Sequence, residues 1–200
     1  NDFSGSETKN YLENNKETLH FQLINLEEIT QSPSPNYKIT LQKAQEMALS
    51  LNVPLLIIES DVIIKKNTIS QLLEISSQLK NPGLVGAITV DSSGNYNFPY
   101  SQVKPDKKPW DKTNRSLSFC CTLICCEFLA KYDFRSLSDK KDWYDISISR
   151  QSREAGFHNY LIKKTEVLHL PHSSRPWKQL KYSNPLKYYF YKLIKHRDKI

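Results

Sequence analysis

The residues best placed to do chemistry are two acids, Glu59 and Asp61, which directly follow the apolar run 55–58. A short aliphatic run predicts a strand buried on both faces of a parallel sheet, and such sheets bind ligands outside the carboxyl ends of their strands. Two carboxylates on a turning loop suit Mg²⁺ or Mn²⁺, because these ions prefer hard oxygen ligands and often bind one or two carboxylates together with phosphate oxygens. The alternative is structural, because acids are also favoured just before a helix, here one that Asn67 begins.

A second candidate for metal chemistry is the cysteine group, Cys120, Cys121, Cys125 and Cys126. Zinc sites usually use cysteine pairs that lie well apart along the chain, whereas here two adjacent pairs share one apolar stretch. Neighbouring residues on a strand point to opposite faces, so four such thiols do not easily meet at one ion. We therefore expect buried, reduced thiols, as is usual in a cytosolic compartment.

The elements that must position these residues alternate along the chain. Helices are predicted over 8–16, 39–51, 67–75, 127–132 and 143–155, and strands over 20–26, 55–58, 84–90, 116–125 and 160–170. This alternation predicts an α/β domain with a mostly parallel sheet. The polar, proline-containing segment 91–115 is long enough to suggest a mobile loop over a ligand.

In this order of elements the sequence resembles the family-2 glycosyltransferases with the GT-A fold. LLIIESDVIIKKNTISQLL is similar to the strand, acidic motif and following helix of that family, whose motif is usually D-x-D and here is Glu59-x-Asp61. Further segments resemble the family in chain order: NDFSGSET, GLVGAITV, SFCCTLICCEFLAKYDF, KDWYDISISRQSREAGF, EVLHLPHSS and YSNPLKYYFYKLIK. The family's first strand has no match, so we expect it upstream of Asn1 and the domain 1–182 to be N-terminally incomplete.

The resemblance implies a nucleoside-diphosphate sugar as donor and Mg²⁺ or Mn²⁺ as cofactor. It places the metal ligand on Asp61. Glu59 would contact the sugar, the ribose or a metal-bound water, and Asp2 the nucleotide base.

Two histidines and an arginine near the late strand complete the expected donor site. His169 and His172 would bind the metal or the diphosphate, and Arg175 is a candidate phosphate contact. The alternatives are structural histidines and plain surface charge.

The resemblance also implies an inverting reaction, in which a carboxylate removes the proton from the acceptor hydroxyl while that oxygen attacks the anomeric carbon. Aligned backward from Gly156, Asp145 falls on the family's catalytic aspartate, and Asp142 is the alternative base. Trp143 and Tyr144 are expected to form a platform for the acceptor sugar. Without the resemblance, the aspartate would be interpreted as a helix N-cap beside a half-buried aromatic pair.

The net charge of +7 lies at the C-terminal end of the chain. Residues 175–200 hold eight basic residues and one acidic residue, which leaves twenty of each sign in 1–174. A neutral body argues against a nucleic-acid partner and favours a local anionic one, such as a membrane surface.

The segment 183–200 has the pattern of an amphipathic helix. Pro185 suits a first helical turn, and apolar residues then recur at helical spacing on one face: Leu186, Tyr189, Phe190, Leu193 and Ile194. Such a helix either lies on an anionic membrane or packs on the domain with its lysines in water. No apolar run approaches the roughly 20 residues of a membrane-spanning helix.

We therefore expect an α/β, GT-A-like (Rossmann-related) fold with a mixed, mainly parallel sheet flanked by helices. The expected function is inverting, metal-assisted transfer of a sugar from a nucleoside-diphosphate sugar to a glycan or lipid-linked hydroxyl. The expected location is cytoplasmic, peripheral to the inner face of the plasma membrane. Two other classes stay open: a nucleotidyltransferase or other metal-dependent nucleotide-sugar enzyme, and a non-catalytic, membrane-associated binding module.

Overall fold

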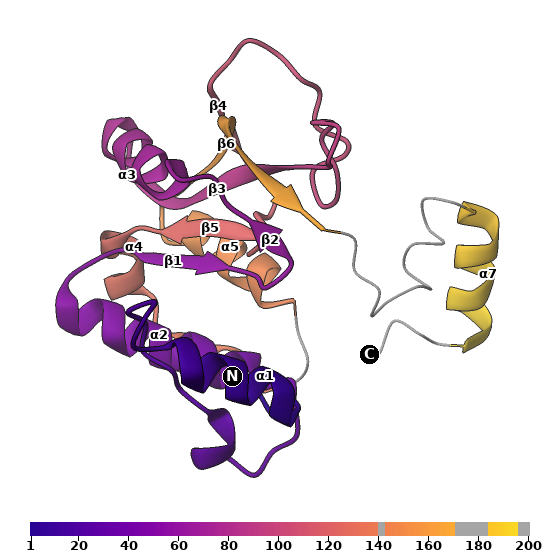
Figure 1. Ribbon diagram of the computed structural model, residues 1–200. Helices are drawn as coiled ribbons and strands as arrows, with labels where there is room; N and C mark the ends of the chain where they lie inside the picture. The colour runs from indigo at the N-terminus through magenta and orange to yellow at the C-terminus, as the bar shows by residue number, and fades with distance from the viewer. Residues whose placement is uncertain (140–142, 171–183, 196–200) are drawn as a thin grey trace.

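The structure is a computed structural model that describes residues 1–139, 143–170 and 184–195. Its elements in chain order are α1 (Ser6–Asn15), η1 (Leu26–Glu28), α2 (Tyr37–Leu51), β1 (Leu55–Ile58), β2 (Val62–Ile63), α3 (Thr68–Gln78), β3 (Pro82–Val90), β4 (Trp110–Thr113), β5 (Cys121–Ile124), α4 (Cys126–Lys131), η2 (Phe134–Ser136), α5 (Tyr144–Glu154), β6 (His158–His169) and α7 (Pro185–Lys195). The chain is an α/β protein in which helices flank a mixed sheet (Figure 1).

The strands of the described residues form one sheet in the order β1-β5-β3-β6-β2, with β4 also paired to β6. Only β3 and β6 pair in parallel, while the β1–β5, β3–β5, β2–β6 and β4–β6 pairs are antiparallel. The expectation of a mainly parallel sheet is therefore wrong. The reason lies between β3 and β5, where residues 91–120 contain no helix. Parallel neighbours need a long crossover, usually a helix, and without one the chain returns in the opposite direction.

The prediction that β1 is buried on both faces is also wrong. β1 pairs only with β5 and is an edge of the described sheet. Leu55 and Ile57 pack against one core cluster and Leu56 against another, but Ile58 is 39% exposed. The residues of β1 are apolar because core side chains partly cover both faces of the strand, and not because the strand lies in the centre of the sheet.

Most of the other predicted elements are confirmed within a few residues. They include α2, α3, α4 and α5 among the helices, and β3, β5 and β6 among the strands. Asn52, in a left-handed conformation, ends α2, and Gly156 at φ +88° follows α5. The predicted strand over 20–26 is wrong, because residues 21–25 have no regular structure and η1 follows them.

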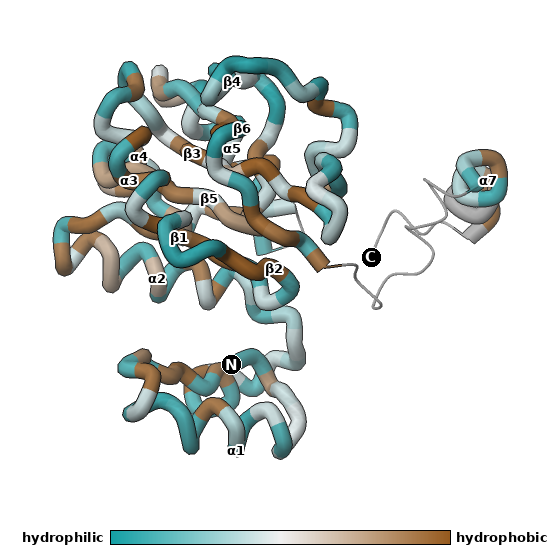
Figure 2. Tube along the Cα trace, turned by 45° about the horizontal axis from the view of Figure 1, so that its top comes forward, coloured by the Kyte–Doolittle hydropathy of each residue, from teal (hydrophilic) through white to brown (hydrophobic). Residues whose placement is uncertain are grey.

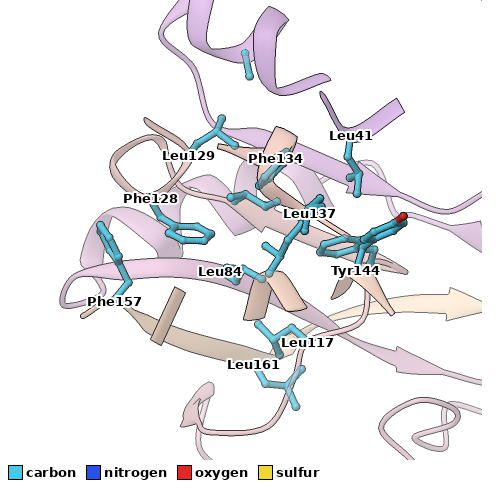
Figure 3. Close-up of a cluster of buried hydrophobic side chains, with 14 of the residues drawn as sticks. Leu41, Leu84, Leu117, Phe128, Leu129, Phe134, Leu137, Tyr144, Phe157 and Leu161 are labelled. Carbon is cyan, nitrogen blue, oxygen red and sulfur yellow. The ribbon is translucent and has the colours of Figure 1, made fainter. Parts of the chain in front are cut away.

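Two clusters of buried side chains hold the helices against the sheet. β3 contributes to both because its side chains alternate: Leu84 and Ile88 face the cluster under α2, α4 and α5, whereas Val85 and Ala87 face the one under α3. Figure 3 shows the larger cluster, to which α2, β3, α4, α5 and β6 all contribute. The sheet is thereby covered on both faces.

The helix predicted near the C-terminus is confirmed as α7. In Figure 2 hydrophobic residues follow the strands of the sheet and also appear on α7. Five of its apolar side chains are exposed: Leu186 85%, Tyr189 55%, Phe190 63%, Leu193 80% and Ile194 55%. None of the helices in the described ranges is long and apolar enough to cross a membrane.

Candidate functional site

The turn formed by residues 59–61 crosses one end of the sheet. β1 and β2 lie at opposite ends of the strand order although only this turn separates them in the chain. The backbone N–H of Glu59 donates to the carbonyl of Cys120, just before β5, at 3.1 Å. The N–H of Leu170, just after β6, donates to the carbonyl of Asp61 at 2.8 Å. These two bonds fix one acid beside the start of β5 and the other beside the end of β6.

Asp61 and His169 form a close pair at this end of the sheet. β2 pairs antiparallel with the last residues of β6, so that Val62 is opposite His169. The Nε2 atom of His169 lies 3.1 Å from Oδ2 of Asp61, and both side chains are largely buried. Two of the three residues predicted to bind a metal are thus brought together.

The other ring nitrogen sets the orientation of His169. Its Nδ1 lies 2.7 Å from the carbonyl oxygen of Phe98, which can only accept a hydrogen bond, so Nδ1 carries a proton. Thr89 donates its hydroxyl proton toward the carbonyls of Asn97 and Phe98, and the Asn97 amide donates to the carbonyl of His169. The segment that follows β3 therefore holds the imidazole with Nε2 toward Asp61.

The separation of the two atoms is that of a hydrogen bond or ion pair, and both atoms are also of types that ligate divalent cations. A bare Nε2 lone pair and a carboxylate oxygen repel each other, so contact requires a proton or a cation between them. Adjacent ligands of an octahedral ion with bonds of about 2.1 Å lie about 3.0 Å apart, close to the observed separation of 3.1 Å. The described residues contain no group of three or more His, Cys, Asp or Glu side chains that would hold a metal. A site built on Asp61 and His169 thus needs further ligands, as Mg²⁺ sites that use phosphate oxygens do.

Glu59 contacts the thiol of Cys120. Cys120 Sγ donates to Oε2 of Glu59 at 3.4 Å. Burial raises the pKa of the thiol, and the negative charges of Glu59 and Asp61 raise it further. The thiol therefore stays protonated, and the charges of both Glu59 and Asp61 contribute to its raised pKa. The four cysteines are free thiols; Cys120 and Cys121 are buried as expected, whereas Cys125 and Cys126 are only partly buried.

Asp145 lies in the first turn of α5 and belongs to the same region. Its Oδ1 accepts the N–H of Ile146 at 2.8 Å. Burial raises the pKa of Asp145 to about 6, and the charge of Glu59 contributes although the bond from Ile146 acts in the opposite direction. The charge of an acid at a strand end thus contributes to the pKa of an acid on a later helix.

Asp2 is engaged in the loop that begins α2. Its carboxylate accepts hydrogen bonds from the hydroxyl of Ser34 and from the backbone and side-chain amides of Asn36, each at 2.8 Å. Partial burial raises its pKa, but the bonds from Asn36 and Ser34 outweigh this and hold the pKa of Asp2 below its ordinary value. Asp2 therefore positions the start of α2, and contact with a nucleotide base stays a prediction.

The aromatic pair predicted to bind the acceptor is divided between surface and core. Trp143 is 52% exposed, whereas Tyr144 is buried and donates its hydroxyl proton to the carbonyl of Ser138 at 3.0 Å. Three other predicted residues, Asp142, His172 and Arg175, lie outside the described residues.

Tyr37, which the sequence analysis did not single out, also reaches this region. It is the first residue of α2, and its pKa is raised by burial and then by the charges of Glu59 and Asp145. Its ring packs edge-on against Phe119 and Tyr144. No motif or spacing links it to the acids, so only the fold identifies it.

Two surface hollows lie away from these residues. One, of about 230 Å³, lies between α2 and α4, beside Gln45 and Leu129. The other, of about 250 Å³, lies beside Lys163 and Asp106. Neither is lined by Glu59, Asp61, Asp145 or His169.

Models of known protein families give no match to this chain, and neither do the curated proteins. The fold does match solved structures. One of these is A197 from STIV, with a TM-score of 0.50 and 15% sequence identity over 80% of this chain and 78% of that chain. At this identity the likeness shows the fold alone, a mixed sheet flanked by helices that is compatible with a Rossmann-like architecture.

Proposed function

We propose that this chain is an inverting glycosyltransferase with a GT-A-like domain, which transfers a sugar from a nucleoside-diphosphate sugar to a glycan or lipid-linked hydroxyl. The observation that carries the proposal is the buried carboxyl of Asp145, whose pKa burial raises to about 6 with the charge of Glu59 as a further cause. A buried carboxyl whose pKa lies near neutral, beside a second acid, is characteristic of functional sites.

Asp145 is the proposed base. A general base works best when its pKa is near the working pH, because it is then ionised and still accepts a proton readily. The raised pKa of Asp145 meets this requirement better than that of an ordinary aspartate. The N–H of Ile146 donates to one carboxylate oxygen of Asp145.

Asp61 and His169 are the residues that would hold Mg²⁺ or Mn²⁺. When bound, such an ion would neutralise the negative charge that builds up on the leaving diphosphate. The protein's part is to hold the two ligand atoms together, through the bond from Nδ1 of His169 to Phe98 and the backbone bond to Asp61.

Release of nucleoside diphosphate from a panel of nucleotide sugars with Mn²⁺ tests this function. We expect Asp145→Asn and Asp61→Asn each to lower the rate by more than about a hundredfold, the usual weight of a catalytic acid–base group or metal. The rate of the wild-type chain should rise with pH as Asp145 ionises around pH 6. Asp133→Asn, a change at the residue that caps η2, is the control and should retain the rate. If Asp145→Asn leaves the rate unchanged, or no donor is turned over, the proposal is wrong.

A second observation, the exposed apolar face of α7, supports attachment to a membrane. Leu186 and Leu193 are at least 80% exposed, and residues 175–200 carry the whole net charge of +7. A helix with exposed apolar residues in a basic segment binds anionic bilayers by burying its apolar face among the lipids. We expect α7 to bring the enzyme to lipid-linked acceptors.

Sedimentation with vesicles tests this attachment. The full chain should bind vesicles that contain an anionic lipid, bind vesicles of neutral lipid weakly, and lose binding as salt is added. A chain that ends at Ser183 should bind neither. Equal and negligible sedimentation of both chains would remove the membrane role and leave the transferase proposal intact.

A further inference from the structure

The hollow of about 250 Å³ lies where the segment before β4 meets β6, away from the acids of the candidate site. An aromatic residue, an aspartate and four lysines line it: Tyr96, Asp106, Lys107, Lys108, Lys163 and Lys164. Its volume is below that of the sites that usually hold drug-sized molecules, so it suits a small ligand. Four lysines around one small hollow make charge the property that needs a physical reason.

A bulge in β6 brings these lysines together. The pairing of β6 with β3 is interrupted at residues 163–165, which have no partner on β3. There the carbonyl of Pro109 accepts the N–H of Lys163 at 2.9 Å and that of Lys164 at 3.1 Å, just before β4 begins beside β6 (Figure 1). Bulges re-aim side chains and often lie beside functional sites. This one ties two segments that are distant in the chain, so that lysines from both line the same hollow.

Lys163 is the buried lysine of the group and fixes the segment before β4. Its ammonium group donates to Asp106 and, at 2.7 Å, to Asp111, and its side chain is only 2% exposed. Asp106 also accepts the backbone N–H of Lys108 at 2.9 Å. The charge of Lys163 is therefore matched by two carboxylates, and the chain around Lys108 is held in place through Asp106.

The other three lysines have no such match. Lys107, Lys108 and Lys164 are exposed, and within the described ranges none of their ammonium groups forms an ion pair or a hydrogen bond. Positive charges gathered around a concave surface repel one another and attract anions to it. Lysine is a common contact for phosphate, and a phosphate group carries more charge than a carboxylate against which to balance several ammonium groups.

We propose that this hollow binds a small phosphate-bearing ligand, with Lys107, Lys108 and Lys164 as its charged contacts. Tyr96 offers an aromatic surface to the rest of the ligand. The site is separate from Asp61 and His169, and the proposal does not depend on the transferase function. A soluble ester and a lipid headgroup both present a phosphate group, so the test has an arm for each source.

A titration of the isotope-labelled full chain, followed by NMR, tests binding of soluble phosphates. Inorganic pyrophosphate and glucose 6-phosphate should each shift the backbone amide signals of Lys107, Lys108 and Lys164, whereas glucose, which has no charge, should not. The buffer contains EDTA, because removal of divalent cations prevents metal-dependent binding of phosphates at Asp61 and His169.

Two triple variants separate a specific site from general attraction to a basic protein. The hollow variant removes its three exposed lysines: Lys107→Gln, Lys108→Gln and Lys164→Gln. The control variant removes the same charge at three lysines that line neither hollow: Lys43→Gln, Lys66→Gln and Lys80→Gln. The hollow variant should bind pyrophosphate about tenfold more weakly, because an exposed charge contact contributes up to about fivefold, and the control should stay within about twofold of the wild type. Both variants should melt at the wild-type temperature.

Sedimentation of the full chain with vesicles tests the lipid source. If a headgroup is the ligand, the wild-type chain should prefer phosphatidic acid, which exposes a phosphate monoester, to phosphatidylglycerol, and the hollow variant should lose this preference. If the ligand is soluble, neither lipid is preferred and the amide shifts with glucose 6-phosphate remain. Helix α7 is the same in both chains, so its own binding to lipid does not affect the comparison.

Three results would overturn the proposal. The first is that neither soluble probe shifts these amides and phosphatidic acid is not preferred. The second is that the hollow variant binds as tightly as the wild type, or melts at a lower temperature, which would make its lysines structural. The third is that both triple variants lose binding equally, since net charge alone would then account for it. Turnover of nucleotide sugars is measured separately, so none of these results affects the transferase proposal.

Discussion

Replacing Asp145 with asparagine should stabilise the fold near neutral pH while it removes the proposed base. Burial, with Glu59 as a second cause, raises the pKa of Asp145 from its ordinary 3.8 to about 6 in the folded chain. At about 1.4 kcal/mol per pH unit, this rise means that the ionised carboxylate destabilises the folded state by about 3 kcal/mol. Asparagine keeps the size of the side chain and an oxygen that accepts the Ile146 N–H, but it carries no charge.

The pH dependence of this effect has a definite sign. Above about pH 6 the carboxylate is ionised in both the folded and the unfolded chain, and the folded state bears the whole destabilisation. As the pH falls through about 6, the folded chain binds a proton before the unfolded chain does, and the wild type gains stability relative to the variant. Below the ordinary pKa of 3.8 the difference has disappeared.

Thermal unfolding followed by circular dichroism at several pH values measures the difference. A chain of this size shifts its melting temperature by about 2–4 °C per kcal/mol, so the variant should melt about 6–12 °C higher at about pH 7.5 and at the wild-type temperature near pH 4. Asp133→Asn is the control of opposite sign. The N–H of Arg135 lowers the pKa of Asp133, so this variant should lose stability at neutral pH and recover it in acid.

The reasoning is refuted if Asp145→Asn melts at or below the wild-type temperature at about pH 7.5, or if its advantage grows as the pH falls. Either result would mean that Asp145 is not a buried carboxylate under the influence of Glu59. The assignment of Asp145 as a base with a raised pKa would then be lost as well.

Two further predictions concern buried polar groups outside the site. The side chain of Gln45 donates to two carbonyls and accepts one N–H of the segment 129–134. Gln45→Leu should therefore lower the free energy of unfolding, measured in urea, by about 3 kcal/mol. An unchanged free energy would show that water replaces these hydrogen bonds. Lys163 donates to Asp106 and, at 2.7 Å, to Asp111. Lys163→Met should therefore lower the free energy of unfolding by about 2 kcal/mol. Because the ammonium group is buried, this loss should change little with salt concentration. A large salt dependence would contradict the second account.

Local patterns were sufficient to predict much of the secondary structure. Helix α2 follows from apolar residues at helical spacing and a stop at Asn52, and α5 from its termination at Gly156. The apolar segment 84–90, which follows a break at Asn81-Pro82-Gly83, predicted β3, and the strand character of 160–170 predicted β6. The direction of β5 was missed although a signal existed, because the long segment before it contains no helix to make a parallel crossover.

The candidate site was predicted in part. The sequence analysis named Glu59, Asp61, Asp145 and His169 as site residues, and the structure brings Asp61 to His169, while Glu59 contacts the Cys120 thiol. It did not predict that Tyr144 would lie in the core, that Asp2 would hold the start of α2, or that Tyr37 would reach the acids. These outcomes depend on which faces of the helices and of the sheet are covered by other elements, and the sequence of a single segment does not show this.

The sequence by itself determined the positions of most helices and of β1, β3, β5 and β6, the polar turn after β1 and the basic, amphipathic C-terminal segment, because periodicity, end signals and charge are local properties of a chain. Tertiary structure decided the direction of the strands, the edge position of β1 and the raised pKa of Asp145. Strand pairing joins residues as distant as Val62 and His169, and a pKa depends on the burial and charges that packing creates. The chemistry proposed for this protein therefore depends on contacts of the turn 59–61 with residues next to β5 and β6, which form only in the folded sheet.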